Sequence, residues 1–135
     1  MTHTEHKSRR TGEIRTVDVL IIEDHPDGRA SLQTLLEYQG YEVEVAADGA
    51  EGLEKGVTLR PQVALVDIGL PILDGFEVAR RLRAVLGQDI RLLACTAYGQ
   101  PEIRQRALEA GFDALQVKPL DLDRLMEWIE ESLGH

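Results

Sequence analysis

Short apolar segments and longer amphipathic segments alternate along the chain from residue 17 onward. The apolar segments have the length of strands, and most of them lack alternating polar residues. Continuous apolar segments of this length are typical of parallel strands that are buried on both faces. The pattern predicts strands at 17–22, 43–46, 63–66, 92–95 and 114–117.

The segments between these strands have apolar residues at helical spacing and recognisable ends. Residues 27–39 place Leu32, Leu35 and Leu36 on one face, and Gly40 follows as a C-terminal stop. Helices are predicted at 27–39, 49–58, 75–86, 101–110 and 121–133. Strands that alternate with helices predict an α/β fold, namely a doubly wound five-stranded parallel sheet with five helices.

Length and composition favour a single domain with an aliphatic core. The chain has 135 residues, of which 43% are hydrophobic but only 4% aromatic. Residues 1–15 are polar and show no period, so we expect a flexible N-terminal tail followed by one domain over 16–135. The apolar runs are too short to span a membrane.

Net charge and cysteine content further restrict the partners and the cellular compartment that we expect. A net charge of −9 argues against direct contact with nucleic acid. The single cysteine, Cys95, excludes an internal disulfide framework, and we interpret it as an inert core thiol. We therefore expect a soluble cytoplasmic protein that binds neither nucleic acid nor membrane directly.

Polar side chains follow four of the five predicted strands. In a parallel sheet these positions meet at one edge, where α/β proteins hold their ligands. The first strand is followed by Glu23 and Asp24, the third by Asp67, the fourth by Thr96 and the fifth by Lys118. We expect these side chains to share a small cleft.

Three carboxylates in one cleft repel one another unless positive charge lies between them. Lys118 supplies one positive charge, and Mg²⁺ is the natural second partner because it prefers oxygen ligands. A carboxylate beside such an ion can attack phosphorus as a nucleophile. The Thr96 hydroxyl and Lys118 are placed to neutralise the oxygens of the transferred group.

The same residues, in this order, resemble the receiver domain of two-component response regulators. The matching set is Glu23-Asp24, Asp67 with Pro71 four residues later, Asp74-Gly75, Thr96-Ala97 and Lys118-Pro119. The resemblance covers about residues 17–133 and implies the flavodoxin-like fold of receivers. It also implies a signalling switch in a two-component phosphorelay, which catalyses only its own phosphorylation and dephosphorylation and is otherwise not an enzyme.

The resemblance implies a role for each site residue. Asp67 is the phospho-acceptor, and Thr96 and Lys118 contact the phosphoryl oxygens. Mg²⁺ is held by Asp24, by Glu23 through water, by Asp67 and by the backbone carbonyl of Gly69. The Lys118–Pro119 bond is expected to be cis.

The resemblance also implies partners. The phosphoryl group comes from a sensor histidine kinase or a histidine phosphotransfer protein. A downstream protein binds the face formed by residues 101–133.

Some positions depart from the common receiver pattern. Leu115 stands where many receivers carry a switch Tyr or Phe, so we expect the conformational signal to pass through the backbone after Thr96 instead. Gly69 and Tyr98 occupy the positions expected to tune hydrolysis of the acyl phosphate.

Two other functions are compatible with parts of the pattern. A Mg²⁺-dependent phosphohydrolase with an Asp nucleophile usually carries a second acid two residues after the nucleophile, where this chain has Gly69. A receiver-fold protein-interaction module that acts without phosphorylation would have lost the acidic pair, the acceptor or the lysine, and this chain has all of them.

We infer structural rather than chemical roles for several other polar residues. His25 adjoins the acidic pair and is a candidate metal ligand, but Mg²⁺ chemistry does not require nitrogen, so we favour its interpretation as a loop residue. Asp48-Gly49 and Asp74-Gly75 are interpreted as turns. Arg80, Arg81 and Arg83 are expected on the solvated side of a helix.

Overall fold

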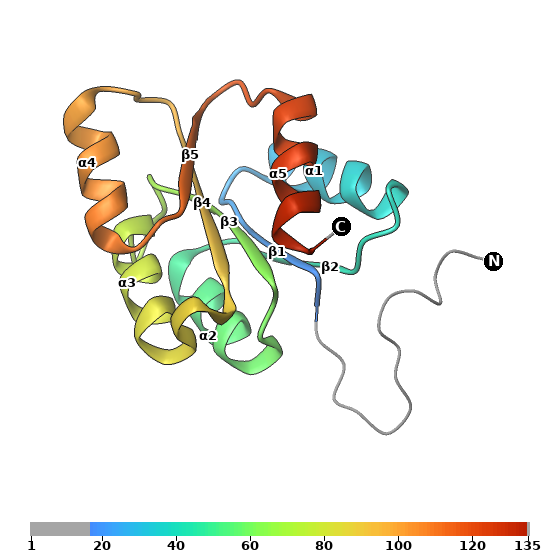
Figure 1. Ribbon diagram of the computed structural model, residues 1–135, viewed down its shortest axis with the longest axis horizontal. Helices are drawn as coiled ribbons and strands as arrows, with labels where there is room; N and C mark the ends of the chain where they lie inside the picture. Colours follow the sequence, from blue (N-terminus) through green and yellow to red (C-terminus); the bar gives the residue numbers. More distant parts are fainter. Residues whose placement is uncertain (1–16, 135) are drawn as a thin grey trace.

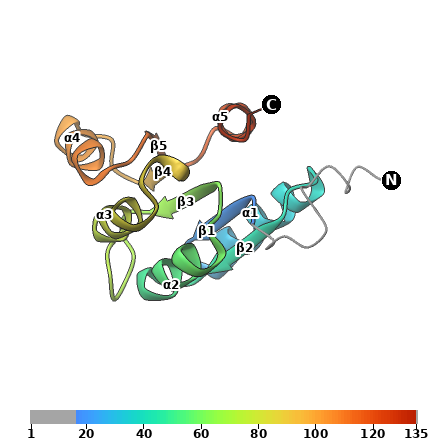
Figure 2. The ribbon, with the colours of Figure 1, turned by 60° about the horizontal axis from the view of Figure 1, so that its bottom comes forward.

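The computed structural model describes residues 17–134 and contains one parallel five-stranded sheet with helices on both faces (Figures 1 and 2). The strand order is β2-β1-β3-β4-β5, as expected for a doubly wound sheet. The strands are β1 (Val19–Ile22), β2 (Val43–Ala46), β3 (Val63–Asp67), β4 (Arg91–Thr96) and β5 (Ala114–Val117). The helices are α1 (Pro26–Tyr38), α2 (Gly49–Leu59), α3 (Gly75–Leu86), the 3-10 helix η2 (Gly87–Asp89), α4 (Pro101–Ala110) and α5 (Leu122–Ser132).

The predicted fold class is confirmed, and the predicted elements shift by a few residues at their ends. The first strand begins two residues later than predicted, at Val19. Strands β3 and β4 run one residue further, so that Asp67 and Thr96 are themselves the last residues of their strands. Their backbones still pair with the neighbouring strands, Asp67 with Cys95 and Thr96 with Val117. The proposed tail, residues 1–15, lies outside the described residues.

The sheet divides an aliphatic core into two layers. Helices α2, α3 and α4 cover one face, and α1 and α5 cover the other (Figure 1). Leu20, Ile22 and Val66 point toward the first layer, whereas Ile21 and Leu65 point toward the second. Alternate residues of one strand thus face opposite layers, which explains why β1 and the first four residues of β3 are all apolar.

Cys95 is buried in the layer beneath α1 and α5, as its sequence context predicts. Burial raises the pKa of this thiol to about 12. The thiolate, which is the reactive form, is therefore scarce at neutral pH.

Aspartates fix the N-termini of several helices. The carboxylates of Asp48, Asp74 and Asp121 accept hydrogen bonds from the backbone N–H groups of Glu51, Glu77 and Arg124, respectively. Each is an N-cap of the kind that satisfies an otherwise free helical donor. The structural role predicted for Asp74 is confirmed, because it turns the chain from the β3–α3 loop into α3.

The prediction for Arg83 is wrong, although Arg80 and Arg81 are exposed as expected. The side chain of Arg83 is only 16% exposed and forms an ion pair with Asp113 at 2.9 Å. Its guanidinium also donates to the backbone carbonyls of residues 87, 90 and 111. Arg83 thereby ties α3 to the start of β4 and to the turn that precedes β5.

None of the helices within residues 17–134 combines the length and the apolar character needed to cross a lipid bilayer.

Gly75 allows α3 to begin directly against the end of β3. A Cβ atom at position 75 would lie 2.6 Å from the Asp67 carbonyl oxygen and 2.7 Å from the Ile68 Cα. Both contacts are to backbone, which cannot move aside without displacing Asp67. Gly75→Ala should therefore lower the free energy of unfolding by about 1–3 kcal/mol, as in other overpacked sites, measured by urea denaturation.

Gly28 provides the matched control for this substitution. It lies in α1, and a Cβ there would meet no atom within 4 Å. Gly28→Ala should raise stability by about 0.5–1 kcal/mol, because alanine is the better helix former. Equal effects of the two substitutions would contradict the close approach assigned to Gly75.

Candidate functional site

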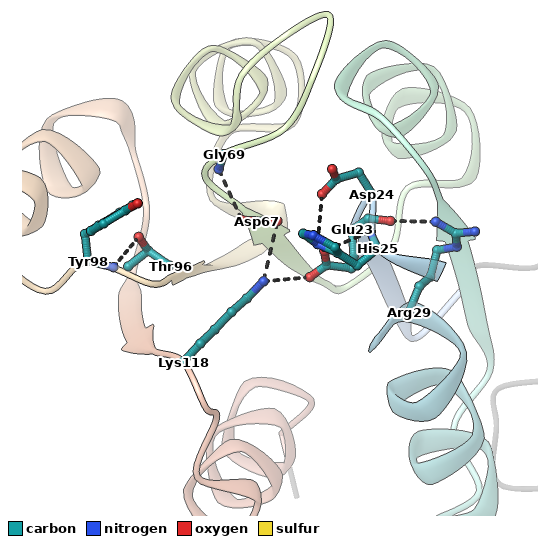
Figure 3. Close-up of polar contacts among 9 residues, drawn as sticks. All are labelled: Glu23, Asp24, His25, Arg29, Asp67, Gly69, Thr96, Tyr98 and Lys118. Carbon is teal, nitrogen blue, oxygen red and sulfur yellow. Dashed lines mark hydrogen bonds and ion pairs between the residues drawn. The ribbon is translucent and has the colours of Figure 1, made fainter. Parts of the chain in front are cut away.

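The polar residues predicted to converge do lie together at the carboxyl edge of the sheet (Figure 3). Glu23 and Asp24 follow β1, Asp67 ends β3, and Lys118 follows β5. The Lys118 ammonium lies 2.9 Å from a carboxylate oxygen of Glu23 and 3.5 Å from one of Asp67. The Lys118–Pro119 peptide bond is cis, as the resemblance implied.

The carboxylate of Asp67 is buried and held at both of its oxygens. Its Oδ1 accepts a hydrogen bond of 3.1 Å from the backbone N–H of Gly69, and its Oδ2 faces Lys118. Burial and the nearby negative charge of Glu23 raise the pKa of Asp67, and outweigh the opposing effects of the Gly69 N–H and Lys118. The Gly69 N–H and the Lys118 ammonium therefore compensate the negative charge of Asp67 only in part.

The Glu23 carboxylate lies closer to the Lys118 ammonium than the Asp67 carboxylate does. Burial acts to raise its pKa, but hydrogen bonds from Lys118 and from His25 outweigh burial and lower the pKa to about 2. The backbone N–H of His25 donates to Glu23 Oε2, while Lys118 donates to Oε1. Both carboxylate oxygens of Glu23 therefore already have protein donors.

The carboxylate of Asp24 is the most accessible of the three acids. Its side chain is 31% exposed, compared with 13% for Glu23 and 10% for Asp67. The ion pair described for it is with His25, at 3.5 Å. Asp24 can therefore accept a new ligand without giving up a strong partner.

Carboxylate oxygens of Glu23, Asp24 and Asp67 and a ring nitrogen of His25 all lie within 4.8 Å of one another. Oxygen donors of this kind, partly open to water, fit Mg²⁺, which keeps several water ligands. The site residues therefore fit the predicted metal. Gly69 contacts Asp67 through its N–H, and the metal contact of its carbonyl stays a prediction.

Thr96 closes the opposite side of the cleft. It is buried, and its Oγ1 accepts a hydrogen bond of 3.0 Å from the backbone N–H of Tyr98. The Thr96 hydroxyl is still free to donate its own proton. The backbone N–H of Lys118 donates to the Thr96 carbonyl at 2.7 Å, which joins the ends of β4 and β5.

The residues that depart from the receiver pattern leave space around the site. A Cβ at Gly69 would approach only Asp67 Oδ1, at 4.0 Å, so this side of the carboxylate is open. Tyr98 is 63% exposed and therefore lies largely in solvent. Leu115 packs against the core and lines a cavity of about 220 Å³ with residues of α4.

A larger groove of about 560 Å³ opens beside the cleft, between α1 and the segment that follows β5. Glu23 and Lys118 lie at one end of it. The rest of its lining includes the apolar side chains of Leu32, Leu35, Leu120 and Leu122. The site is therefore approachable by a large partner from the side of α1.

Two contacts of the site were not anticipated from the sequence. The Nδ1 atom of His25 lies 3.0 Å from Glu23 Oε2, so this loop residue also contacts the acidic cluster. The guanidinium of Arg29 donates to the backbone carbonyl of Glu23 at 2.8 Å. The adjacency of His25 to the acidic pair was the only sequence signal, and Arg29 gave none.

Comparison with known proteins agrees with this geometry. A family model, the response regulator receiver domain, matches residues 19–130. The response regulator MprA of Mycobacterium ulcerans is 39% identical over 111 residues, which is 82% of this chain and 47% of that protein. MprA of Mycobacterium bovis is 38% identical over the same length. The chain spans about half the length of these curated relatives.

Solved structures show the same similarity. The chemotaxis protein CheY4 of Vibrio cholerae is 30% identical with a TM-score of 0.79, covering 87% of this chain and 98% of that chain. The receiver domain of the sensor histidine kinase PA1611 of Pseudomonas aeruginosa, solved with a magnesium ion coordinated in its active site cleft, is 27% identical with a TM-score of 0.79. The match covers 89% of this chain and 99% of that one. The residues gathered at the sheet edge, the strand order and these matches together show that this chain belongs to the response regulator receiver domain family.

Proposed function

We propose that this receiver domain accepts a phosphoryl group on Asp67 and thereby changes its affinity for a downstream protein. The donor is the phosphohistidine of a sensor histidine kinase or of a histidine phosphotransfer protein. The observation that carries the proposal is the position of the Asp67 carboxylate, which lies at the sheet edge between the Gly69 N–H and the Lys118 ammonium. We place this exchange in the cytoplasm.

In the proposed reaction a carboxylate oxygen of Asp67 attacks the phosphorus atom of the donor. An O–P bond forms, the P–N bond of the phosphohistidine breaks, and the imidazole leaves with a proton from solvent. Because Gly69 and Lys118 each contact one oxygen of Asp67, the carboxylate is oriented before the donor arrives. Its raised pKa indicates an anion that is poorly stabilised and therefore reactive.

Lys118 and Thr96 receive the charge of the transferred group. The ammonium of Lys118 is already near Asp67, so it can contact a phosphoryl oxygen with little movement. The Thr96 hydroxyl, which accepts from Tyr98 in the unphosphorylated protein, has a proton that it can donate once it turns toward a phosphoryl oxygen. Neither residue needs to change its protonation state.

Mg²⁺ would be held by Asp24 and Asp67, by Glu23 through water and by the carbonyl of Gly69. When bound, it supplies positive charge to the phosphoryl oxygens. The magnesium ion in the related PA1611 receiver supports this assignment. Asp24 is the principal ligand in this proposal because it is exposed, whereas both oxygens of Glu23 already have donors.

The proposed activity is confined to the chain's own phosphorylation and dephosphorylation. A phosphohydrolase would need an acid near the leaving group, and Gly69 leaves that position open. An interaction module that acts without phosphorylation would not need the three acids and Lys118 at one edge. We therefore favour the phospho-accepting switch over both alternatives.

Phosphorylation should occur at Asp67 and should require Mg²⁺. Incubation with a small phosphodonor such as acetyl phosphate and Mg²⁺ should increase the intact mass by one phosphoryl group. Asp67→Asn should abolish this increase because an amide oxygen is a poor nucleophile, and EDTA should abolish it in the parent protein.

Asp74→Asn is the matched control for that experiment. Asp74 is also close to the site in sequence, but its carboxylate caps α3, and asparagine caps helices equally well. This variant should be labelled like the parent. Labelling of Asp67→Asn to the parent level would exclude Asp67 as the acceptor.

The output surface is proposed to be the face formed by α4, β5 and α5, within residues 101–133. The signal reaches it through the backbone after Thr96. When the Thr96 hydroxyl turns toward a phosphoryl group, its hydrogen bond from the Tyr98 N–H must change. Leu115 has no hydroxyl that can exchange partners, so it contributes little to this change.

A phosphoryl mimic should therefore shift the backbone NMR signals of residues 97–100 and the start of α4 most strongly, and that of Leu115 weakly. We expect Leu115→Ala to retain the loop response, since the Thr96–Tyr98 contact involves backbone and hydroxyl atoms only. If Leu115→Ala abolishes the loop response while Tyr98→Ala leaves it intact, Leu115 is the switch and the proposed route is wrong.

A further inference from the structure

His25 brings a nitrogen atom into a site that is otherwise built from oxygen. The residue occupies the N-cap position of α1, directly after the acidic pair. Its ring is 74% exposed, yet Nδ1 faces inward, 3.0 Å from Glu23 Oε2 and 3.5 Å from Asp24 Oδ1 (Figure 3). His25 is therefore a loop residue, as the sequence predicted, but one whose ring nitrogen lies among the acidic side chains.

The geometry is close to that of a mixed nitrogen and oxygen metal site. One ligand atom from each of Glu23, Asp24, His25 and Asp67 lies within 4.8 Å of the others. Ligands at about 2.0–2.2 Å from one ion can be at most about 4.4 Å apart. The two atoms that are furthest apart must therefore move closer by at least a few tenths of an ångström, and an exposed imidazole can adjust its position to allow this.

The choice of ion follows from the ligand atoms. Mg²⁺ prefers oxygen and gains little from an imidazole, whereas Ni²⁺, Cu²⁺ and Zn²⁺ bind imidazole well and bind mixed sites more tightly than Mn²⁺ or Fe²⁺. An Asp or Asn in place of His25 would leave the site selective for hard ions. This chain instead offers one imidazole nitrogen, a ligand of intermediate softness, beside hard carboxylate oxygens.

We propose that His25 is a nitrogen ligand through which the cleft beside Asp67 binds divalent first-row transition-metal ions such as Ni²⁺ in competition with Mg²⁺. The inference rests on the metal site of the proposed function. The coordinating atom is Nδ1. In the metal-free protein it faces the carboxylates of Glu23 and Asp24 and carries a proton that it donates to them. The metal ion would replace that proton, which is released to solvent, and the neutral ring would then keep its proton on Nε2. Because Lys118 contacts Glu23 through Oε1 and His25 faces Oε2, the Glu23–Lys118 pair can persist while such an ion is bound.

The consequence for the switch is competition for Asp67. An ion held by His25, Asp24 and Asp67 occupies the carboxylates that Mg²⁺ needs. Transition-metal ions should therefore displace Mg²⁺ at concentrations far below its own. The concentration of transition-metal ions around the protein would then affect the phosphorylation of Asp67, in addition to the supply of phosphodonor.

The test uses the full chain in a background that removes the other three of its four histidines. The background substitutions are His3→Gln, His6→Gln and His135→Gln, which leave His25 as the only imidazole. Isothermal titration with Ni²⁺ and, separately, with Mg²⁺ gives the ratio of the two affinities. In the His25→Asn variant this ratio should fall about tenfold or more, as expected for the loss of one imidazole ligand.

A spectroscopic readout identifies the ligand directly. Cu²⁺ bound to the background protein should show nitrogen coupling in its electron paramagnetic resonance spectrum, and the coupling should change when histidine is labelled with ¹⁵N. An unchanged coupling, no binding of Ni²⁺, or an equal affinity ratio in His25→Asn would overturn the inference.

The outcome is separable from that of the proposed function. If Ni²⁺ binds through His25 but the parent accepts no phosphoryl group with Mg²⁺, the proposed function fails and this inference stands. If Asp67 is phosphorylated with Mg²⁺ and Ni²⁺ binding is indifferent to His25, the inference fails alone.

Discussion

The ammonium of Lys118 is the interaction on which the rest of the site depends. It contacts Glu23 at 2.9 Å and Asp67 at 3.5 Å, and so joins the carboxyl ends of β5, β1 and β3. Without this charge, Glu23, Asp24 and Asp67 would repel one another at the sheet edge. Because Lys118 lies closer to Glu23, the negative charge of Glu23 is well compensated, whereas that of Asp67 is compensated only in part.

This inequality separates the roles of the acids. Glu23 has a pKa lowered to about 2 and two protein partners, so it is a fixed structural anion. Asp67 has a raised pKa and an open side above Gly69, so it is the carboxylate that a phosphoryl group or a metal can approach. Asp24 is exposed and available to a metal. The contacts of Lys118 and the degree of burial thus place the three acids in different environments.

The site is held by buried segments on the side of β3 and α3, and by fewer described contacts on the side of the turn after β4. Strand β3 is buried throughout, and α3 begins in direct contact with its last residue through Gly75. Arg83 fastens α3 to the segments around β4 and β5. The Thr96–Tyr98 turn, by contrast, is held by a single described hydrogen bond to a hydroxyl, which suits it to transmit a change.

The sequence predicted the fold and the site residues because their signals are local. Apolar runs mark buried strands, and Asp67, Thr96 and Lys118 stand at strand ends whose convergence follows from a parallel sheet. Arg83 was missed because most of its partners are backbone carbonyls, which leave no pattern of residue types, and its one acidic partner, Asp113, is 30 residues away. The inward direction of His25 Nδ1 depends on the turn into α1, and the preference of Lys118 for Glu23 depends on a difference between two distances that is smaller than one ångström. Neither quantity is encoded in residue identity.

The central claim, that Lys118 compensates Glu23 more than Asp67, is tested most directly by titrating the carboxyl groups. The ¹³C signals of the Glu23 and Asp67 carboxyl carbons would be followed by NMR across acidic pH in metal-free protein. The account predicts that Glu23 titrates near 2, well below its ordinary 4.5, and that Asp67 titrates above its ordinary 3.8. An Asp67 that titrates at or below 3.8, with Glu23 near 4.5, would contradict the account.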